Sequence, residues 1–296
     1  MKTYLECIPC FFNQALEAGI LAGVQKKKQK EIMDEVSKLI PELSLNESPP
    51  EMISKIQRVI RDILNLNDPY KKIKQKSNIL ALKINAMLEM EIKSSQDSLL
   101  TAIQISIIGN IIDYGAKNNF NVEEEIQQLL EGDLSDKLTY NPEVFKYQQF
   151  KDSLCRVKNI LFLADNAGEV VFDKILIKEL VEKYNKKIIY VVKSEPIIND
   201  ALVEDAIFCG IDEYAEIISN GTDAPGTLLK DCSDEFIRQY QDANLIISKG
   251  QGNYESLSEE KKPIFFLFKA KCPVIARDVG CQIGELILDC FLKHHD

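Results

Sequence analysis

The chain has 296 residues, enough for one large domain or for two smaller ones with cores of their own. Its 36 Lys and Arg are outnumbered by 46 Asp and Glu, and the formal net charge of −10 argues against a protein that coats nucleic acid. No apolar run approaches the roughly 18 residues that span a bilayer, and the N-terminus does not resemble a signal peptide. We therefore expect a soluble, cytoplasmic protein that binds neither membranes nor nucleic acid.

Histidine is nearly absent, which narrows the possible chemistry. The two histidines are His294 and His295, at the end of the chain. Their position argues against Ser-His-Asp catalysis, Cys-His catalysis and a His-rich zinc centre. The chemistry must therefore depend on carboxylates, amides, lysines, thiols or a metal that oxygen atoms hold.

The first half of the chain carries a helical pattern. Apolar residues recur every three or four positions, the spacing of a helix with one buried face, and the last of the segments is apolar nearly all round. Pro49 and Pro50 indicate a helix boundary. The segments are 51–66, 78–90 and 98–115. We predict an all-helical region over residues 1–155 that covers the functional site.

Short apolar runs rich in Ile, Val and Phe appear in the second half. Each is bounded by polar or turn residues, as expected of strands that are buried on both faces. The runs are 159–165, 187–192, 244–250 and 263–268. An amphipathic helix over 170–187 separates the first two runs and completes a βαβ unit. We therefore predict an α/β protein in which residues 156–296 form a Rossmann-like region with a parallel sheet.

Polar residues follow each of these runs, at the carboxyl ends where open parallel sheets bind ligands. The four polar segments are 165–169, 193–200, 249–254 and 269–273. Asp and Asn oxygens suit a hard divalent cation, while lysines and glycine backbone N–H groups suit a phosphate. Their coincidence predicts a metal-assisted phosphoryl site. Taken singly, DNAGE is typical of a turn that caps a helix. Gly250, Gly252 and Glu255 do not complete the GxGxxG pattern, so a nicotinamide or flavin enzyme is only weakly supported.

Several motifs together carry a resemblance to a known family. They are CIPC (7–10) with Gln14, GNIID (109–113), DNAGE (165–169), PIINDA (196–201) and KGQGNYE (249–255). In this order, over essentially the whole chain, they resemble the metal-dependent damage-control phosphatase family, formerly catalogued as a domain of unknown function. The N-terminal CxxC is similar to that of its compact archaeal and bacterial branch. Better-characterised branches carry Asp where this chain has Gln251, so their substrate rules do not transfer.

The resemblance implies a divalent-metal-dependent phosphatase that hydrolyses phosphomonoesters such as sugar phosphates or damaged phosphometabolites. Its metal, Mg²⁺, Mn²⁺, Co²⁺ or Ni²⁺, would be held by Asp165, Asn166 and Asp200. The implied partner is a small phosphorylated metabolite. A covalent phosphate on Asp165 is the alternative to direct attack by water. The sequence identifies neither the physiological substrate nor the oligomeric state.

The resemblance and the phosphoryl mechanism that we expect together assign residues to the substrate and to the reaction. The expected substrate contacts are Asn110, Gly168 and Asn253. Lys249 would stabilise the phosphoryl oxygens, and Asp113 or Glu169 would orient or deprotonate the attacking water. Because GNIID lies in a very apolar helical segment, an internal hydrogen-bond network is the alternative role of its polar residues.

Two other functions stay open at this point. The Rossmann-like half suggests methyl transfer from S-adenosylmethionine to a carboxyl group, although no acidic residue follows a Gly-rich first loop to bind the ribose. A non-catalytic metal- or nucleotide-binding module would keep the ligands without turnover. Metal-dependent release of phosphate would exclude both alternatives.

Cys7 and Cys10 form the CxxC of a chain with eight cysteines. Three interpretations compete: thiols packed as small apolar groups, a redox pair, and a zinc site completed by Cys272 or Cys281. The first is favoured, because a lone CxxC supplies two of the four ligands that zinc usually has. We expect the double substitution Cys7→Ser/Cys10→Ser to leave phosphatase activity measurable and to lower mainly the stability.

Overall fold

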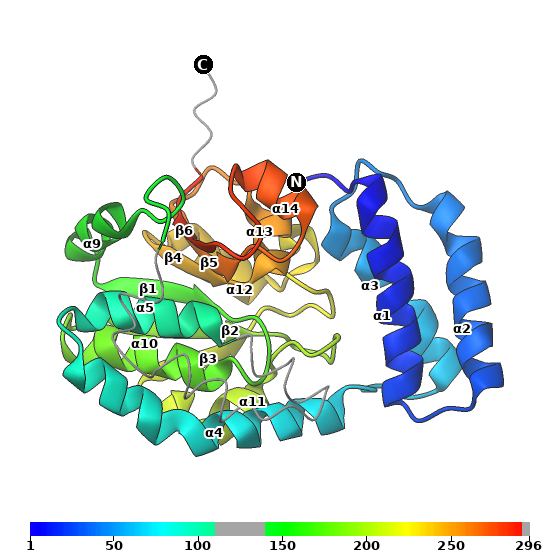
Figure 1. Cartoon of the computed structure of the whole chain (residues 1–296), viewed down its shortest axis with the longest axis horizontal. Helices are drawn as coiled ribbons and strands as arrows, with labels where there is room; N and C mark the ends of the chain where they lie inside the picture. Colours follow the sequence, from blue (N-terminus) through cyan, green and yellow to red (C-terminus); the bar gives the residue numbers. More distant parts are fainter. Residues whose placement is uncertain (110–139, 292–296) are drawn as a thin grey trace.

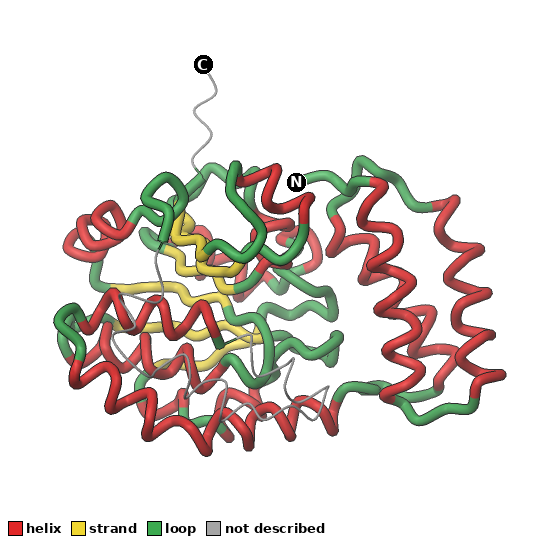
Figure 2. Tube along the Cα trace, viewed as in Figure 1, coloured by secondary structure: helices red, strands yellow, loops and turns green. Residues whose placement is uncertain are grey.

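The structure, a computed structural model, describes residues 1–109 and 140–291 and shows a sheet between helices, with further helices beside it (Figures 1 and 2). The helices are α1 (Ile8–Leu21), α2 (Lys26–Leu39), α3 (Pro49–Leu64), α4 (Lys71–Ser94), α5 (Ser98–Ile108), α9 (Tyr147–Arg156), α10 (Val170–Glu182), α11 (Val203–Phe208), α12 (Asp234–Asp242), α13 (Gln251–Leu257) and α14 (Pro273–Val279). The strands are β1 (Asn159–Leu163), β2 (Lys187–Val192), β3 (Ala215–Ser219), β4 (Ile246–Lys249), β5 (Ile264–Lys269) and β6 (Leu286–Asp289).

One six-stranded sheet with the order β3-β2-β1-β4-β5-β6 forms the centre of the molecule. β1 to β5 run parallel, and β6 runs antiparallel to β5. Neighbouring residues of a strand face opposite sides, so Phe162 joins a core with α5 and α10, whereas Leu163 joins a core with α12, α13 and α14. Because both faces are covered, the central strands appear in the sequence as continuous apolar runs.

Helices α1, α2 and α3 stand beside the sheet, at the right of Figure 1, and pack around a core of their own. α3 begins at Pro49, after Ser48, whose backbone N–H donates to Glu51 Oε2 at 2.7 Å as in a capping box. The helix ends at Asn65, which adopts the left-handed conformation with φ 47°. This end directs the chain toward α4, which runs along the sheet region (Figure 1).

The β6 edge of the sheet is extended by residues 144–146. The N–H of Lys146 donates to the Leu288 carbonyl at 2.6 Å, and the N–H of Leu288 donates to the Val144 carbonyl at 3.0 Å. Phe145 and Leu288 thereby form an isolated parallel bridge. The segment that precedes α9 covers the outer edge of β6 at this point.

The predicted fold class is confirmed, and the four predicted strands correspond to β1, β2, β4 and β5. The sequence pattern does not reveal β3, which is partly exposed, or β6, which has four residues, and the antiparallel β6 departs from an all-parallel sheet. The boundary between residues 155 and 156 stays a prediction, and α4 and α5 from the first region pack on α10 from the second.

Within the described ranges, no helix has the length and apolar character that a membrane crossing requires.

Candidate functional site

A cleft of about 620 Å³ lies between the carboxyl ends of the strands and the helices α1 and α3. The strand order reverses between β1 and β4, and such a switch point opens a crevice where α/β sheets bind ligands. The side chains on the sheet side of the cleft include Asp165, Asn166, Asp200, Gln251 and Lys271. The segments that follow β1, β2, β4 and β5 therefore meet in one cleft.

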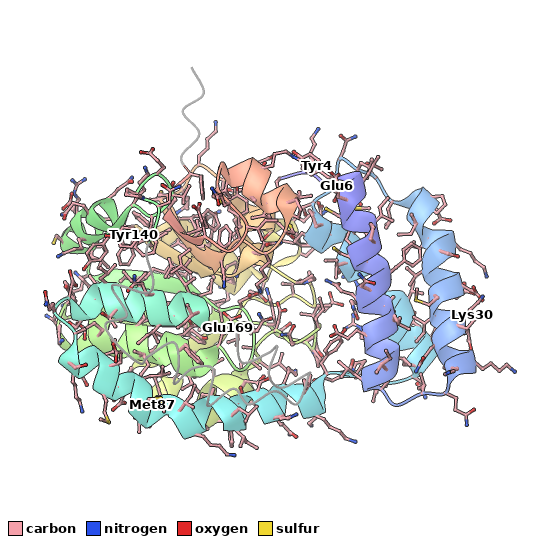
Figure 3. The ribbon with its side chains drawn as sticks, viewed as in Figure 1. Tyr4, Glu6, Lys30, Met87, Tyr140 and Glu169 are labelled. Atoms are coloured by element: carbon pink, nitrogen blue, oxygen red, sulfur yellow. The ribbon has the colours of Figure 1, made fainter. Side chains whose placement is uncertain are left out.

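The three predicted metal ligands are neighbours at this edge of the sheet. The Asp165 carbonyl accepts a hydrogen bond from the N–H of Ala201 at 2.8 Å, and Asn166 and Asp200 form an isolated antiparallel bridge. The Asn166 amide donates to Asp165 Oδ2 at 3.0 Å and to Glu169 Oε1 at 2.7 Å. Since Nδ2 is occupied in this way, Oδ1 is the amide atom left for a metal. Figure 3 labels Glu169, which lies near the carboxyl ends of the strands, on the side of the sheet that faces α1.

Gly250 packs directly against the carboxylate of Asp165. Its φ is +83°, and a Cβ at this position would lie 2.0 Å from Asp165 Oδ2 and 2.1 Å from Cγ. A side chain does not fit this space, and the positive φ favours glycine independently. The backbone that leaves β4 thus supports the side chain that follows β1.

Carboxylates outnumber ammonium groups around the predicted ligands. Among the described residues, the carboxylates are Asp165, Glu169, Asp173 and Asp200, and the ammonium groups in ion-pair contact with them are Lys193 and Lys249, so four ionised carboxylates would leave an excess of two negative charges. Burial raises the pKa of Asp165 well above its usual range, and the charges of Glu169 and Asp200 raise it further. Burial also raises the pKa of Asp200 to about 6, against the opposing charge of Lys193. A divalent cation would neutralise this excess.

The donor set fits a hard divalent cation. Asp200 Oδ2 is buried, accepts no hydrogen bond from the described residues, and lies 3.6 Å from Lys193 Nζ. Asp165 and Asn166 add a carboxylate and an amide oxygen, which are ligands that Mg²⁺ and Mn²⁺ accept. Over residues 1–109 and 140–291, no three His, Cys, Asp or Glu side chains form a metal-binding group. The third donor of the predicted set is accordingly an amide.

Lys249 lies behind these ligands and is 1 % exposed. Its ammonium donates to Asp173 Oδ1 at 2.6 Å, to the Ser106 carbonyl at 2.7 Å and to Glu169 Oε2 at 3.4 Å. Burial lowers its pKa, but the charges of Asp173 and Glu169 outweigh burial and raise the pKa above its usual range. All three N–H groups of the Lys249 ammonium therefore have acceptors inside the protein, and one of these contacts holds the Glu169 carboxylate. The predicted contact of Lys249 with a phosphate stays a prediction.

Asn253 and Gly168 also belong to the support of the site. Asn253 Nδ2 donates to the carbonyls of Ala164 at 3.0 Å and Lys249 at 2.8 Å, and Oδ1 accepts from Thr227 Oγ1 at 2.7 Å. Asn253 therefore joins the ends of β1 and β4. Gly168 is buried in the turn between β1 and α10. Neither residue is among the described residues that line the cleft, and their predicted contacts with substrate stay predictions.

Two predicted site residues, Asn110 and Asp113, lie outside the described residues. Sequence reasoning missed Lys74 on α4, which is 2 % exposed, pairs with Asp68 Oδ2 at 2.8 Å and lowers the pKa of Asp200. It is one of several lysines at the start of this helix. The helical spacing of α4 distinguishes Lys74 from the neighbouring lysines, because Lys74 lies on the same face of the helix as the buried residues that follow it.

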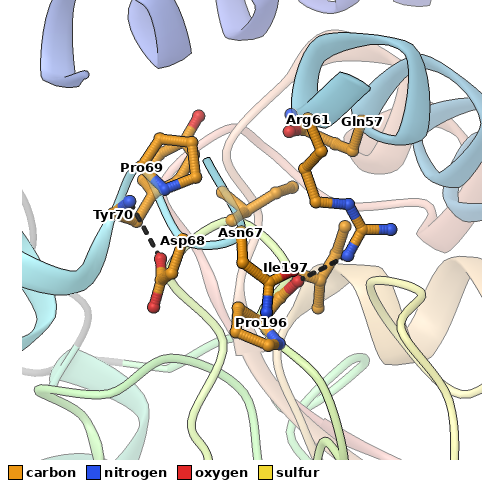
Figure 4. A pocket seen from close by; sticks show the side chains of 9 residues that line it. Gln57, Arg61, Asn67, Asp68, Pro69, Tyr70, Pro196 and Ile197 are labelled. Carbon is orange, nitrogen blue, oxygen red and sulfur yellow. Dashed lines mark hydrogen bonds between the residues drawn. The ribbon is translucent and has the colours of Figure 1, made fainter. Parts of the chain in front are cut away.

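The loop that carries Asp200 also contacts α3 and the segment before α4. Arg61 of α3 donates to the Pro196 carbonyl at 3.1 Å, and the N–H of Tyr70 donates to Asp68 Oδ1 at 2.9 Å. Figure 4 shows Pro196 lying between these groups, around a small pocket. Both α3 and the segment before α4 therefore lie beside the Asp200 loop.

Together these features define an α/β protein with a Rossmann-like sheet and an Asp- and Asn-lined cleft at its switch point. Residues 3–287 match the damage-control phosphatase ARMT1-like domain. The chain belongs to this family, which confirms the family resemblance seen in the sequence motifs.

Relatives cover nearly the whole chain. An uncharacterized protein from Methanocaldococcus jannaschii is 36% identical over 97% of this chain and 95% of its own length. A damage-control phosphatase from Pyrococcus horikoshii is 35% identical over 97% of both chains. The crystal structure of a DUF89 family protein from Pyrococcus horikoshii matches with a TM-score of 0.87 at 32% identity, covering 98% of this chain and 99% of that one. The relative that is named a damage-control phosphatase supports a phosphatase-type function.

Proposed function

We propose that this chain is a divalent-metal-dependent phosphatase that hydrolyses phosphomonoesters of small metabolites. The observation that carries the proposal is the meeting of Asp165, Asn166 and Asp200 beside Gly250, at the switch point of the sheet. The relatives from Archaeoglobus fulgidus and Pyrococcus horikoshii that are named damage-control phosphatases support the same reaction class.

The chain's contribution to the reaction is to hold three oxygen ligands in fixed positions. When bound to Asp165, Asn166 and Asp200, a divalent cation supplies Lewis-acid polarisation of a phosphoryl oxygen. Glu169 orients the Asn166 amide by accepting from Nδ2, and Lys249 holds Glu169 in turn. Such outer contacts fix the orientation of metal ligands and raise metal affinity.

A carboxylate must take the proton from the attacking water. The proposal assigns this step to Asp113 or Glu169. Both oxygens of Glu169 accept hydrogen bonds, from Asn166 at 2.7 Å and from Lys249 at 3.4 Å. These contacts suit a residue that positions its neighbours, so the choice between the two carboxylates rests on their separate substitution by amides.

The cleft suits a small phosphorylated metabolite. Its volume of about 620 Å³ lies within the range of small-molecule sites. Lys271, which follows β5, lines the cleft, is exposed, and forms no ion pair with the described residues. Asp165 lines the same cleft, and the charge of Lys271 lowers its pKa. We assign to Lys271 the charged contact with a phosphoryl oxygen.

Release of inorganic phosphate tests the proposal. Protein freed of metal with a chelator should hydrolyse p-nitrophenyl phosphate only after Mg²⁺, Mn²⁺, Co²⁺ or Ni²⁺ is added, and a panel of sugar phosphates and other phosphometabolites then ranks the substrates. Lys271→Ala should lower kcat/KM by about 10²-fold. Lys269→Ala is the matched control, because Lys269 is exposed on the same strand end and does not line the described cleft. Folded protein that releases no phosphate with any of the four metals would contradict the proposal.

A further inference from the structure

Three cysteines from distant parts of the chain line the same cleft. Cys7 and Cys10 come from the start of α1, and Cys272 directly precedes α14. Burial raises the pKa of both Cys7 and Cys10, and the neighbouring Cys272 raises each of them further. All three thiols line this one cleft, and Cys7 and Cys272 pack against the same apolar core, so we call the three residues together the thiol cluster.

Within the thiol cluster, Cys7 and Cys10 occupy two facing positions of one helix start. Cys7 is the N-cap of α1 and Cys10 is the third helical residue, with Pro9 between them. In a capping box the residues at these same two positions bond to each other, which shows how close their side chains lie. Residues three apart on a helix have Cβ atoms about 5–6 Å apart, and a disulfide needs about 3.5–4.5 Å. A small adjustment of the helix end closes this difference.

Access to the three thiols differs. Cys10 is exposed, whereas Cys7 and Cys272 are half-buried. The sulfur of Cys272 also accepts a contact from Gln251 Nε2 at 3.8 Å, and the same amide donates to Glu255 Oε1 at 3.0 Å. A reagent that enters the cleft therefore meets Cys10 first.

We propose that Cys7 and Cys10 are a thiol–disulfide exchange pair that reacts with low-molecular-weight disulfides inside the cleft. The Cys10 thiolate attacks one sulfur of a disulfide such as oxidised glutathione, the S–S bond of the reagent breaks, and one glutathione thiolate leaves. The Cys7 thiolate then attacks the sulfur of Cys10 and expels the second glutathione thiolate. The two protein thiols are oxidised to one disulfide, the reagent is reduced to two thiols, and two protons pass from the protein thiols to the released thiolates.

This exchange acts on the cleft itself. Because Cys10 lines the cleft, the mixed disulfide fills part of the space beside Asp165 and Asp200. Closure by Cys7 empties that space again and leaves the oxidised pair in the first turn of α1. The inference depends on neither the metal site nor the phosphatase reaction.

The test is peptide mapping by mass spectrometry of the full chain after incubation with oxidised glutathione in mildly alkaline buffer. Wild type should lose the two free thiols of Cys7 and Cys10, join them in one disulfide, and retain no glutathione there. Cys7→Ser should stop at the Cys10–glutathione mixed disulfide. Cys10→Ser should leave Cys7 reduced. Circular dichroism checks that both variants fold, and if one does not, the wild-type map decides alone.

Cys155, exposed on α9, is the internal control of the same sample. It lies outside the thiol cluster and should retain glutathione in wild type and in both variants. Cys10 that stays reduced while Cys155 is modified would overturn the inference. So would wild-type protein in which Cys10 keeps its glutathione or is joined to Cys272.

Discussion

The two sides of the cleft are held in different ways. On the sheet side, the ion pair of Lys249 and Asp173 is fully buried, with side chains 1% and 0% exposed. On the helix side, Arg58 of α3 pairs with Asp223 through side chains that are 54% and 23% exposed. Removing one partner of a buried pair costs about 3–5 kcal/mol, whereas an exposed pair contributes about 0–1 kcal/mol. The comparison teaches that a buried ion pair supports the predicted ligands on the sheet side, whereas the exposed Arg58 pair contributes little to holding the helix side.

The largest effect should follow from removing Asp165, a proposed metal ligand on the sheet side. Asp165→Ala deletes a charged donor at a loop and leaves the core intact, so kcat/KM for p-nitrophenyl phosphate should fall by about 10³-fold or more. The thermal midpoint should change little, because a carboxylate with a raised pKa does not stabilise the metal-free fold. Asp212→Ala, at an exposed aspartate, is the control. Activity within a few-fold of wild type would remove Asp165 from the site.

The next effect concerns stability. Lys249→Met leaves Asp173 and Glu169 without their buried counter-charge, so the free energy of unfolding should fall by about 3–5 kcal/mol. Urea titration measures the loss. The double variant Lys249→Met/Asp173→Asn should recover part of it, since one uncompensated charge is removed. A single variant as stable as wild type would show that the pair is not coupled in this way.

Gly250 and Gly280 have similar positive φ angles, so substituting each by Ala separates the effect of backbone strain from the effect of a steric clash. Gly250→Ala should lower kcat/KM by about 10²-fold, because its Cβ would displace the carboxylate of Asp165. Gly280 has a φ of +79°, and no atom lies within 4 Å of the position that a Cβ would take there. Gly280→Ala should therefore cost about 1 kcal/mol of stability without loss of activity. Equal activities of the two variants would show that the close approach of Gly250 to Asp165 is unimportant.

A smaller effect should depend on pH. Burial raises the pKa of Glu255 to about 7, from about 4.3 in the unfolded chain, so the folded state binds this proton more tightly. Its contribution to stability is present below about pH 4 and is lost as the pH rises through about 7, by at most about 4 kcal/mol. Glu255→Gln should therefore flatten the decline of the thermal midpoint over this interval. Glu235→Gln, at an exposed glutamate of α12, should follow the wild-type curve.

The smallest effect should come from the helix side. Arg58→Ala removes an exposed ion pair with Asp223, so the free energy of unfolding should change by less than about 1 kcal/mol and kcat/KM should stay within about twofold of wild type. Chemical denaturation and the phosphate-release assay measure both quantities. A loss comparable with that of Lys249→Met would remove the contrast between the two sides of the cleft.

The central strands could be predicted because burial on both faces leaves a continuous apolar run in the sequence. β3 could not, since its residues are only partly buried and its run is interrupted by Glu216. The loops after β1 and β2 could likewise be predicted to converge, because parallel strands end at the same edge. The pattern therefore indicated the segments 165–169 and 193–200, and the family resemblance singled out Asp165 and Asp200 within them.

The surroundings of the ligands could not be predicted in the same way. Lys249 is the last residue of β4, where a lysine resembles a ligand of phosphate, but its acceptors come from Ser106 and Asp173, which are 143 and 76 residues away in the chain. The presence of Cys7 and Cys272 in one cleft likewise depends on how distant parts of the chain pack against the same core. Contacts of such sequence separation have no local pattern, so they appear only in the folded chain.

The segment that covers β6 has a consequence for the behaviour of the protein in concentrated solution. A free strand edge is a template on which another chain can add a strand and begin aggregation. Val144 and Lys146 occupy hydrogen-bonding groups of Leu288 at one end of the sheet. At the other end, β3 has a single strand neighbour among the described residues and carries the exposed Glu216, whose charge opposes the stacking of a second copy. Each edge strand of the sheet, β3 and β6, thus has a feature that opposes the pairing of a further strand from another molecule.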